Sequence, residues 1–252
     1  MSFQEYQNIW VKLSFDDFLQ EKVKNKEVYF ANLTKEENLF LQELDFNRFK
    51  YISQINKNSR VKLFLLSIPK TFYYFIKEEE LEKLAKEYSL NNLEKNIYPY
   101  KKDLTHYFKF ILSKYKKEKF YPYFYDLVNY EISLLKLEEY FLPRIKKNNF
   151  PVLDKDYCLL KANEHLEEML FLISKNKEIN HLDTINKKGY LINKNFIEKL
   201  TWYSYELLLK CNGKKTWENI VKDFIIEEPE LLDYEAKLIS LGDYYIKHNI
   251  LL

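Results

Sequence analysis

The hydrophobic pattern of this chain predicts helices over most of its first 140 residues. Apolar residues recur at helical spacing within residues 45–72, 77–88, 104–116 and 123–141, and prolines interrupt the pattern at positions 69, 99 and 122. Thr34 and Glu37 have the spacing of a capping box, which predicts a further helix beginning near Lys35. We therefore expect a helical bundle in the N-terminal part.

The pattern changes after residue 150. Short β-branched or aromatic runs at residues 157–162, 190–193 and 196–201 predict strands, whereas residues 165–174 fit either a strand or a helix. Three helices are predicted next, at about 202–211, 216–224 and 231–248. Gly213 supplies a left-handed residue after the first helix, and Thr216 caps the second. The third helix is expected to bury one stripe, made of Leu231, Tyr234, Leu238, Leu241 and Tyr245.

Residues 142–151 form the predicted linker, because two prolines flank a basic, Asn-rich segment. The expected fold is mainly α with a small β-sheet. A helical domain at residues 1–145 is followed at 146–252 by a winged-helix-like α+β domain.

Composition excludes several function classes. The 252 residues are 46% hydrophobic and 31% charged, as in a protein with a packed core. Three glycines, Gly189, Gly213 and Gly242, cannot form a glycine-rich phosphate loop. The sequence has no apolar run of membrane-spanning length and no signal-peptide-like segment, and its two cysteines lack metal or redox spacing. We therefore expect a cytoplasmic protein with free thiols and no membrane partner.

The C-terminal module resembles the PqqD-like recognition element of ribosomally made peptide pathways. The resemblance rests on the strand at 196–201, on LLLKCNGKKTWENIVKDF at 207–224 and on LISLGDYYIKHNILL at 238–252. It implies that this module binds the leader of a precursor peptide.

The N-terminal part resembles the helical domain, first described as DNA-binding, of partner proteins of multinuclear non-heme iron-dependent oxidative (MNIO) enzymes. Arg48 and Tyr51 match an Arg-x-x-Tyr helix start, and Pro69 and Thr71 match the Pro-x-Thr end of a leucine-rich helix. The most specific match is PYFYDLVNYE at residues 122–131. The resemblance implies a non-catalytic subunit that forms a heterodimer with an iron enzyme. The chain itself is expected to hold no cofactor, because the iron would belong to the partner.

The sequence contains no recognisable active site. Four histidines, at positions 106, 165, 181 and 248, are scattered singly, and none has metal-ligand spacing. Cys211 lies on the apolar face of a predicted helix, as buried structural thiols do. We therefore predict neither catalytic nor metal-binding residues. A free-standing enzyme of unknown chemistry is the least favoured alternative.

A DNA-binding winged-helix regulator is the main alternative. Residues 101–119 hold seven lysines interleaved with aromatics. This pattern fits either a nucleic-acid-binding patch or a helix with its aromatics in the core and its lysines on the solvent-exposed face. Residues 151–252 carry 14 Lys and 17 acidic residues, a net of −3, so that residues 1–150 carry +5. The winged-helix-like half is thus acidic, and the acidic run at 227–235 would repel phosphates. Nucleic acid is therefore the less favoured partner.

The leader is predicted to pair with an open strand edge and to fill a groove beside the last helix. A one-residue change of register exchanges the two faces of a strand, so the face that meets the leader, Phe196 with Leu200 or Ile197 with Lys199, stays open. The predicted peptide-binding residues are Phe196, Ile197, Glu198, Lys199, Leu200, Ala236, Ile239, Ser240 and Asp243.

Overall fold

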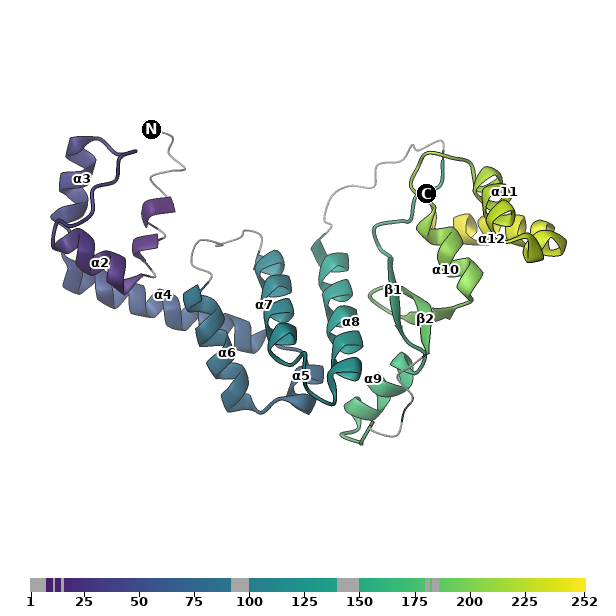
Figure 1. Ribbon diagram of the computed structural model, residues 1–252, viewed down its shortest axis with the longest axis horizontal. Coiled ribbons are helices and arrows are strands. Elements are labelled where there is room, and N and C mark those ends of the chain that lie inside the picture. The colour runs from purple at the N-terminus through teal and green to yellow at the C-terminus, as the bar shows by residue number, and fades with distance from the viewer. Residues whose placement is uncertain are drawn as a thin grey trace. The chain divides into compact units, whose positions relative to one another are not determined.

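The computed structural model describes residues 8–10, 12–14, 16–91, 100–139, 150–179, 182 and 186–252 (Figure 1). The chain separates into two compact units, Met1–Tyr115 and Lys116–Leu252. The described residues are mainly helical, with one three-stranded antiparallel sheet. This confirms the predicted mainly-α class with a small sheet.

Six described helices shape the N-terminal unit: α2 (Asp17–Lys24), α3 (Lys35–Gln42), α4 (Phe46–Leu66), α5 (Lys70–Phe75), α6 (Glu78–Asn91) and α7 (Tyr100–Lys114). The predicted capping box is present, because Thr34 accepts the Glu37 backbone N–H and Glu37 accepts that of Thr34. The long helix α4 ends just before Pro69, which is the N-cap of α5. The helical interpretation of this region is therefore confirmed.

A buried ion pair joins three of these helices. Arg60 of α4 lies 3.0 Å from the Asp103 carboxylate of α7, and the Tyr88 hydroxyl of α6 donates to Asp103 at 2.9 Å. The neighbouring aromatics Tyr107 and Phe108 of α7 are fully buried, and the described lysines of residues 102–119 are exposed. Tyr107 and Phe108 therefore belong to the core. Of the two interpretations of residues 101–119, this agrees with a core helix whose lysines face the solvent.

The C-terminal unit begins with α8 (Tyr121–Glu139) and continues with β1 (Cys158–Asn163), α9 (Leu166–Ser174), β2 (Lys187–Ile192) and β3 (Ile197–Leu200). Residues 166–174 are thus helical. The strands lie in the order β1-β2-β3, and both pairings are antiparallel. Three consecutive residues of the central strand, Tyr190, Leu191 and Ile192, are fully buried, so both faces of the sheet are covered.

Three helices and a 3₁₀ turn follow the sheet: α10 (Trp202–Leu209), α11 (Trp217–Glu227), η2 (Pro229–Tyr234) and α12 (Glu235–Lys247) (Figure 1). Thr201 caps α10, Thr216 caps α11 as predicted, and Gly213 adopts the expected left-handed conformation with φ of 74°. Gly242 lets α12 approach α11 closely, because a Cβ there would lie 2.3 Å from the Trp217 ring. Trp217 also donates its indole N–H to the Leu238 carbonyl at 2.9 Å.

The compact units divide before α8, whereas the predicted domains divide after it. Helix α8 packs beside β1, and buried Asp126 of α8 accepts the Asn163 backbone N–H at 2.8 Å. Lys187 of β2 also forms an ion pair with Asp126. These contacts tie α8 to the sheet. Most of the predicted linker, residues 142–149, lies outside the described residues.

None of the described helices is long and apolar enough to cross a lipid bilayer.

Candidate functional site

Strand β3 lies at an edge of the sheet. It pairs with β2 through Ile197, Glu198, Lys199 and Leu200, and it has no second strand neighbour among the described residues. All five predicted strand residues, 196–200, are therefore at this edge or at its start. Edge strands present unpaired backbone groups that an extended peptide can use.

The hairpin between β2 and β3 shows which backbone groups point outward. The Asn193 N–H donates to the Phe196 carbonyl at 3.0 Å, so this pair is hydrogen-bonded. In an antiparallel ladder, hydrogen-bonded and non-hydrogen-bonded pairs alternate. Glu198 and Leu200 therefore bond to β2, whereas the N–H and C=O groups of Ile197 and Lys199 face the open edge.

The side chains of Phe196, Glu198 and Leu200 share the strand face that meets the helices. Leu200 belongs to the core formed with α10, α11 and α12, and Phe196, 42% exposed, lies with its ring centroid 6.1 Å from that of Tyr157. Burial raises the pKa of Tyr245 on α12, and the nearby Glu198 carboxylate raises it further. The structure thus distinguishes the two strand faces that the sequence left open: Phe196 with Leu200 faces α12.

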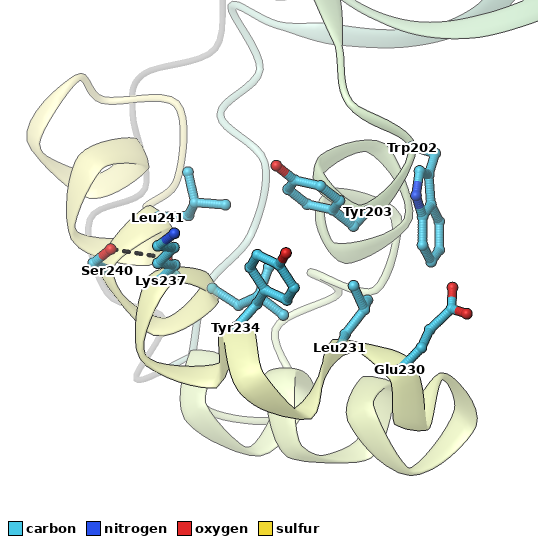
Figure 2. Close-up of a pocket in the computed structure, with 9 residues that line it drawn as sticks. Trp202, Tyr203, Glu230, Leu231, Tyr234, Lys237, Ser240 and Leu241 are labelled. Atoms are coloured by element: carbon cyan, nitrogen blue, oxygen red, sulfur yellow. Dashed lines mark hydrogen bonds between the residues drawn. The ribbon is translucent and has the colours of Figure 1, made fainter.

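A pocket of about 600 Å³ opens directly after β3. Figure 2 shows Trp202 and Tyr203 projecting from the start of α10 toward Leu231 and Tyr234 on η2, which form the opposite wall. The full lining is Trp202, Tyr203, Glu230, Leu231, Tyr234, Lys237, Leu238, Ser240 and Leu241.

Exposed aromatic rings form much of this pocket. Trp202 is 45% exposed and packs against Phe224 with 5.7 Å between ring centroids. Tyr234 is 50% exposed, and the Lys237 ammonium lies 5.3 Å from its ring centroid. Large, partly exposed aromatic side chains beside an apolar floor are typical of binding sites.

Of the four predicted residues on α12, only Ser240 lines the pocket. Ala236 and Asp243 are exposed, and at 100° per residue they lie on the side of the helix opposite the buried Leu238 and Tyr245. Ile239 is half-buried and packs against the core. The structure therefore does not bring Ala236, Ile239 and Asp243 together with the pocket.

Ser240 is the one lining residue that is also among the predicted peptide-binding residues. The other eight were not predicted: Trp202, Tyr203, Glu230, Leu231, Tyr234, Lys237, Leu238 and Leu241. Tyr234 and Leu241 were assigned to a buried stripe because they share the helical spacing of Leu238 and Tyr245. Wall and core residues have the same apolar character, so periodicity alone does not separate them. The pair Trp202–Tyr203 directly after an edge strand was the available signal.

The lining suits binding better than catalysis. Its only charged side chains, Glu230 and Lys237, have no histidine, cysteine or second carboxylate beside them in the lining. No cluster of three potential metal ligands occurs among the described residues. Burial raises the pKa of the Cys211 thiol to about 12, which keeps it protonated and unreactive near neutral pH.

Two of the described histidines have local partners, whereas the Nδ1 atom of His106 is buried and has no hydrogen-bond partner among the described residues. His165 contacts Glu168 at 3.1 Å, and the His248 ring lies on Tyr244 with 4.3 Å between centroids. His181 lies outside the described residues. No protein-family model matches this chain, and no curated protein matches it significantly.

Proposed function

We propose that this chain is a non-catalytic partner subunit in the biosynthesis of a ribosomally made, post-translationally modified peptide. Its β3 edge captures the precursor leader as an added strand, and helices within residues 45–141 contribute the surface that holds an MNIO-type iron enzyme. The observation that carries the first part is the open β3 edge beside an aromatic pocket. The second part rests on the resemblance of residues 48–71 and 122–131 to such partner proteins.

The geometry supports an extended peptide as the ligand. The outward N–H and C=O groups of Ile197 and Lys199 offer backbone hydrogen bonds to an incoming strand. Alternate side chains of that strand lie on the face shared by Phe196 and Leu200, which meets α12. The pocket at the end of β3 is large enough for more than one apolar side chain.

Backbone pairing and side-chain anchoring have different roles in this proposal. The backbone bonds fix the direction and register of the leader with little regard to its sequence, and the pocket selects for apolar or aromatic side chains. The exposed Glu230 and Lys237 at the pocket offer one charge of each sign to polar neighbours of those side chains.

Tethering explains how such a subunit would assist chemistry that it does not perform. A leader held at the β3 edge raises the effective concentration of the attached core peptide at an enzyme held on the same chain. Any iron would be bound by the enzyme, because this chain offers no metal-ligand cluster among its described residues.

DNA binding by the C-terminal unit is the alternative function. Recognition of a duplex requires Lys and Arg against phosphates, yet Glu227, Glu230 and Asp233 around η2 are exposed and acidic. The acidic surface therefore favours the peptide over the duplex.

Two experiments test the proposal. The first titrates the chain into a fluorescently labelled leader segment of a ribosomally made precursor peptide, with a promoter duplex as competitor. Saturable peptide binding that the duplex does not displace supports the proposal, and preferential binding of one duplex supports a regulator. The second co-expresses the chain with an MNIO-type iron enzyme. Co-elution in size-exclusion chromatography supports the heterodimer, and separate elution at micromolar concentration contradicts it.

A further inference from the structure

Helix α4 of the N-terminal unit carries an exposed apolar stripe made of Ile52, Ile55 and Leu66. Their exposed fractions are 44%, 46% and 75%. At 100° per residue the three positions fall within about 60° of one another around the helix. The buried residues Ser53 and Phe64 lie on a different face, so the stripe is separate from the side of α4 that packs into its own unit.

The charge on α4 is of one sign only. Residues 46–66 contain Arg48, Lys50, Lys57, Arg60 and Lys62 and no Asp or Glu. Lys57 and Arg60 are engaged with Asp17 and Asp103. Arg48, Lys50 and Lys62 are exposed and form no ion pair with another described residue of the chain.

The apolar stripe and the positive charges together indicate which kind of partner surface fits α4. Ile52 and Leu66 are separated by about 21 Å of helix, a length that suits packing against one partner helix along its axis. At 100° per residue, Arg48 lies in line with the stripe at its start and Lys62 lies beside it near its end, whereas Lys50 is on the opposite side of the helix. A partner helix with aliphatic residues on one face and carboxylates beside them matches the stripe together with Arg48 and Lys62.

We infer that the α4 stripe is a docking surface for an acidic amphipathic helix of a partner protein. This surface lies in the other unit from the β3 edge, and the inference does not depend on peptide capture. If the iron enzyme is the partner, the acidic helix belongs to that enzyme.

The test uses the full chain and a synthetic helical peptide with leucines on one face and glutamates on both flanks. Controls are a peptide of the same composition in scrambled order and a version with lysine flanks. The acidic amphipathic peptide should bind more tightly than both, and added salt should weaken its binding. Ile55→Glu and Leu66→Glu should each weaken it at least about tenfold.

Gln54→Glu is the matched variant, because it adds the same charge at an exposed position off the stripe. It should change binding less than about twofold, and Lys199→Pro should leave this binding unchanged while it weakens capture of the leader. Equal binding of all three peptides overturns the inference. So does adsorption of the chain to phosphatidylserine vesicles through the stripe, or a dimer of the chain that Leu66→Glu dissociates.

Discussion

The two edges of the small sheet differ: the β1 edge is covered and the β3 edge is open. At the β1 edge, α8 lies beside the strand, buried Asp126 accepts the Asn163 backbone N–H, and Lys187 forms an ion pair with the same carboxylate. At the β3 edge, Ile197 and Lys199 present their backbone groups, and no other described strand pairs with them. A covered edge cannot pair with another chain, whereas an open edge leaves its backbone N–H and C=O groups available for unwanted pairing. The open edge beside a pocket is the feature on which the proposed peptide site rests.

Removing the closure of the β1 edge should produce the largest effect. Asp126→Ala leaves the Asn163 N–H without its acceptor and Lys187 without its ion-pair partner. Because Lys187 is partly exposed, we expect a loss of about 2–3 kcal/mol in the free energy of unfolding. Urea denaturation measures this loss, and Asp126→Asn, which keeps an acceptor, should lose less. An unchanged unfolding free energy would show that this contact does not close the edge.

Blocking the β3 edge should instead affect binding. Lys199→Pro removes an outward N–H without removing a bond to β2, so leader affinity should fall about tenfold or more. Lys199→Ala is the matched control, since both variants lose the contact of the ammonium with the Glu164 carbonyl but only the proline loses the N–H. Equal affinities of the two variants would place the peptide elsewhere.

Filling the pocket should have a smaller effect. Lys237→Trp places a bulky ring at an exposed position of the lining, and leader affinity should fall about fivefold. Ala236→Trp introduces the same ring at the adjacent residue on the outer side of α12 and should leave affinity unchanged. If Ala236→Trp lowers leader affinity more than Lys237→Trp does, the leader binds in the groove beside Ala236 that the sequence predicted and not in the pocket.

The thiol of Cys158 lies on β1, at the covered edge of the sheet. Its alkylation rate should change least when the leader binds. Burial raises the pKa of the thiol, partly offset by Lys136, so in the folded protein alkylation should be slow at neutral pH and should speed up only at alkaline pH. Saturating leader should change the alkylation rate less than about twofold, because Cys158 is on the strand farthest from β3. Strong protection by the leader would move the docking site to the β1 edge.

Local signals in the sequence predicted much of the fold. The Thr34–Glu37 box and Thr216 depend only on neighbouring residues, and both cap helices as predicted. Gly213 has the predicted left-handed conformation, but α10 already ends at Leu209. The place of α8 was not predictable in this way, because Asp126 meets its partners 37 and 61 residues further along the chain. Such contacts leave no periodic pattern.

The strand of the candidate site was predicted from the sequence, and the peptide-binding role of the residues on β3 and α12 stays a prediction. Strand β3 was identified because its run of residues is short and bounded by Asn and Thr, and its position as an edge agrees with the sheet order. Of the residues predicted on α12, Ser240 lines the pocket, whereas Ala236 and Asp243 lie on the side of the helix opposite the buried Leu238 and Tyr245. Tyr234 and Leu241 have the spacing of core residues, yet they line the pocket. Positions at which a local sequence pattern predicts the wrong environment are often found at binding sites.

Backbone amide exchange with and without the leader tests the central claim most directly. In the free chain, the amides of Glu198 and Leu200 should already be protected by their bonds to β2, and those of Ile197 and Lys199 should exchange rapidly. In the complex, Ile197 and Lys199 should become protected as the leader adds its strand. If the leader binds and these two amides continue to exchange at their free rates, the β3 edge is not the binding site.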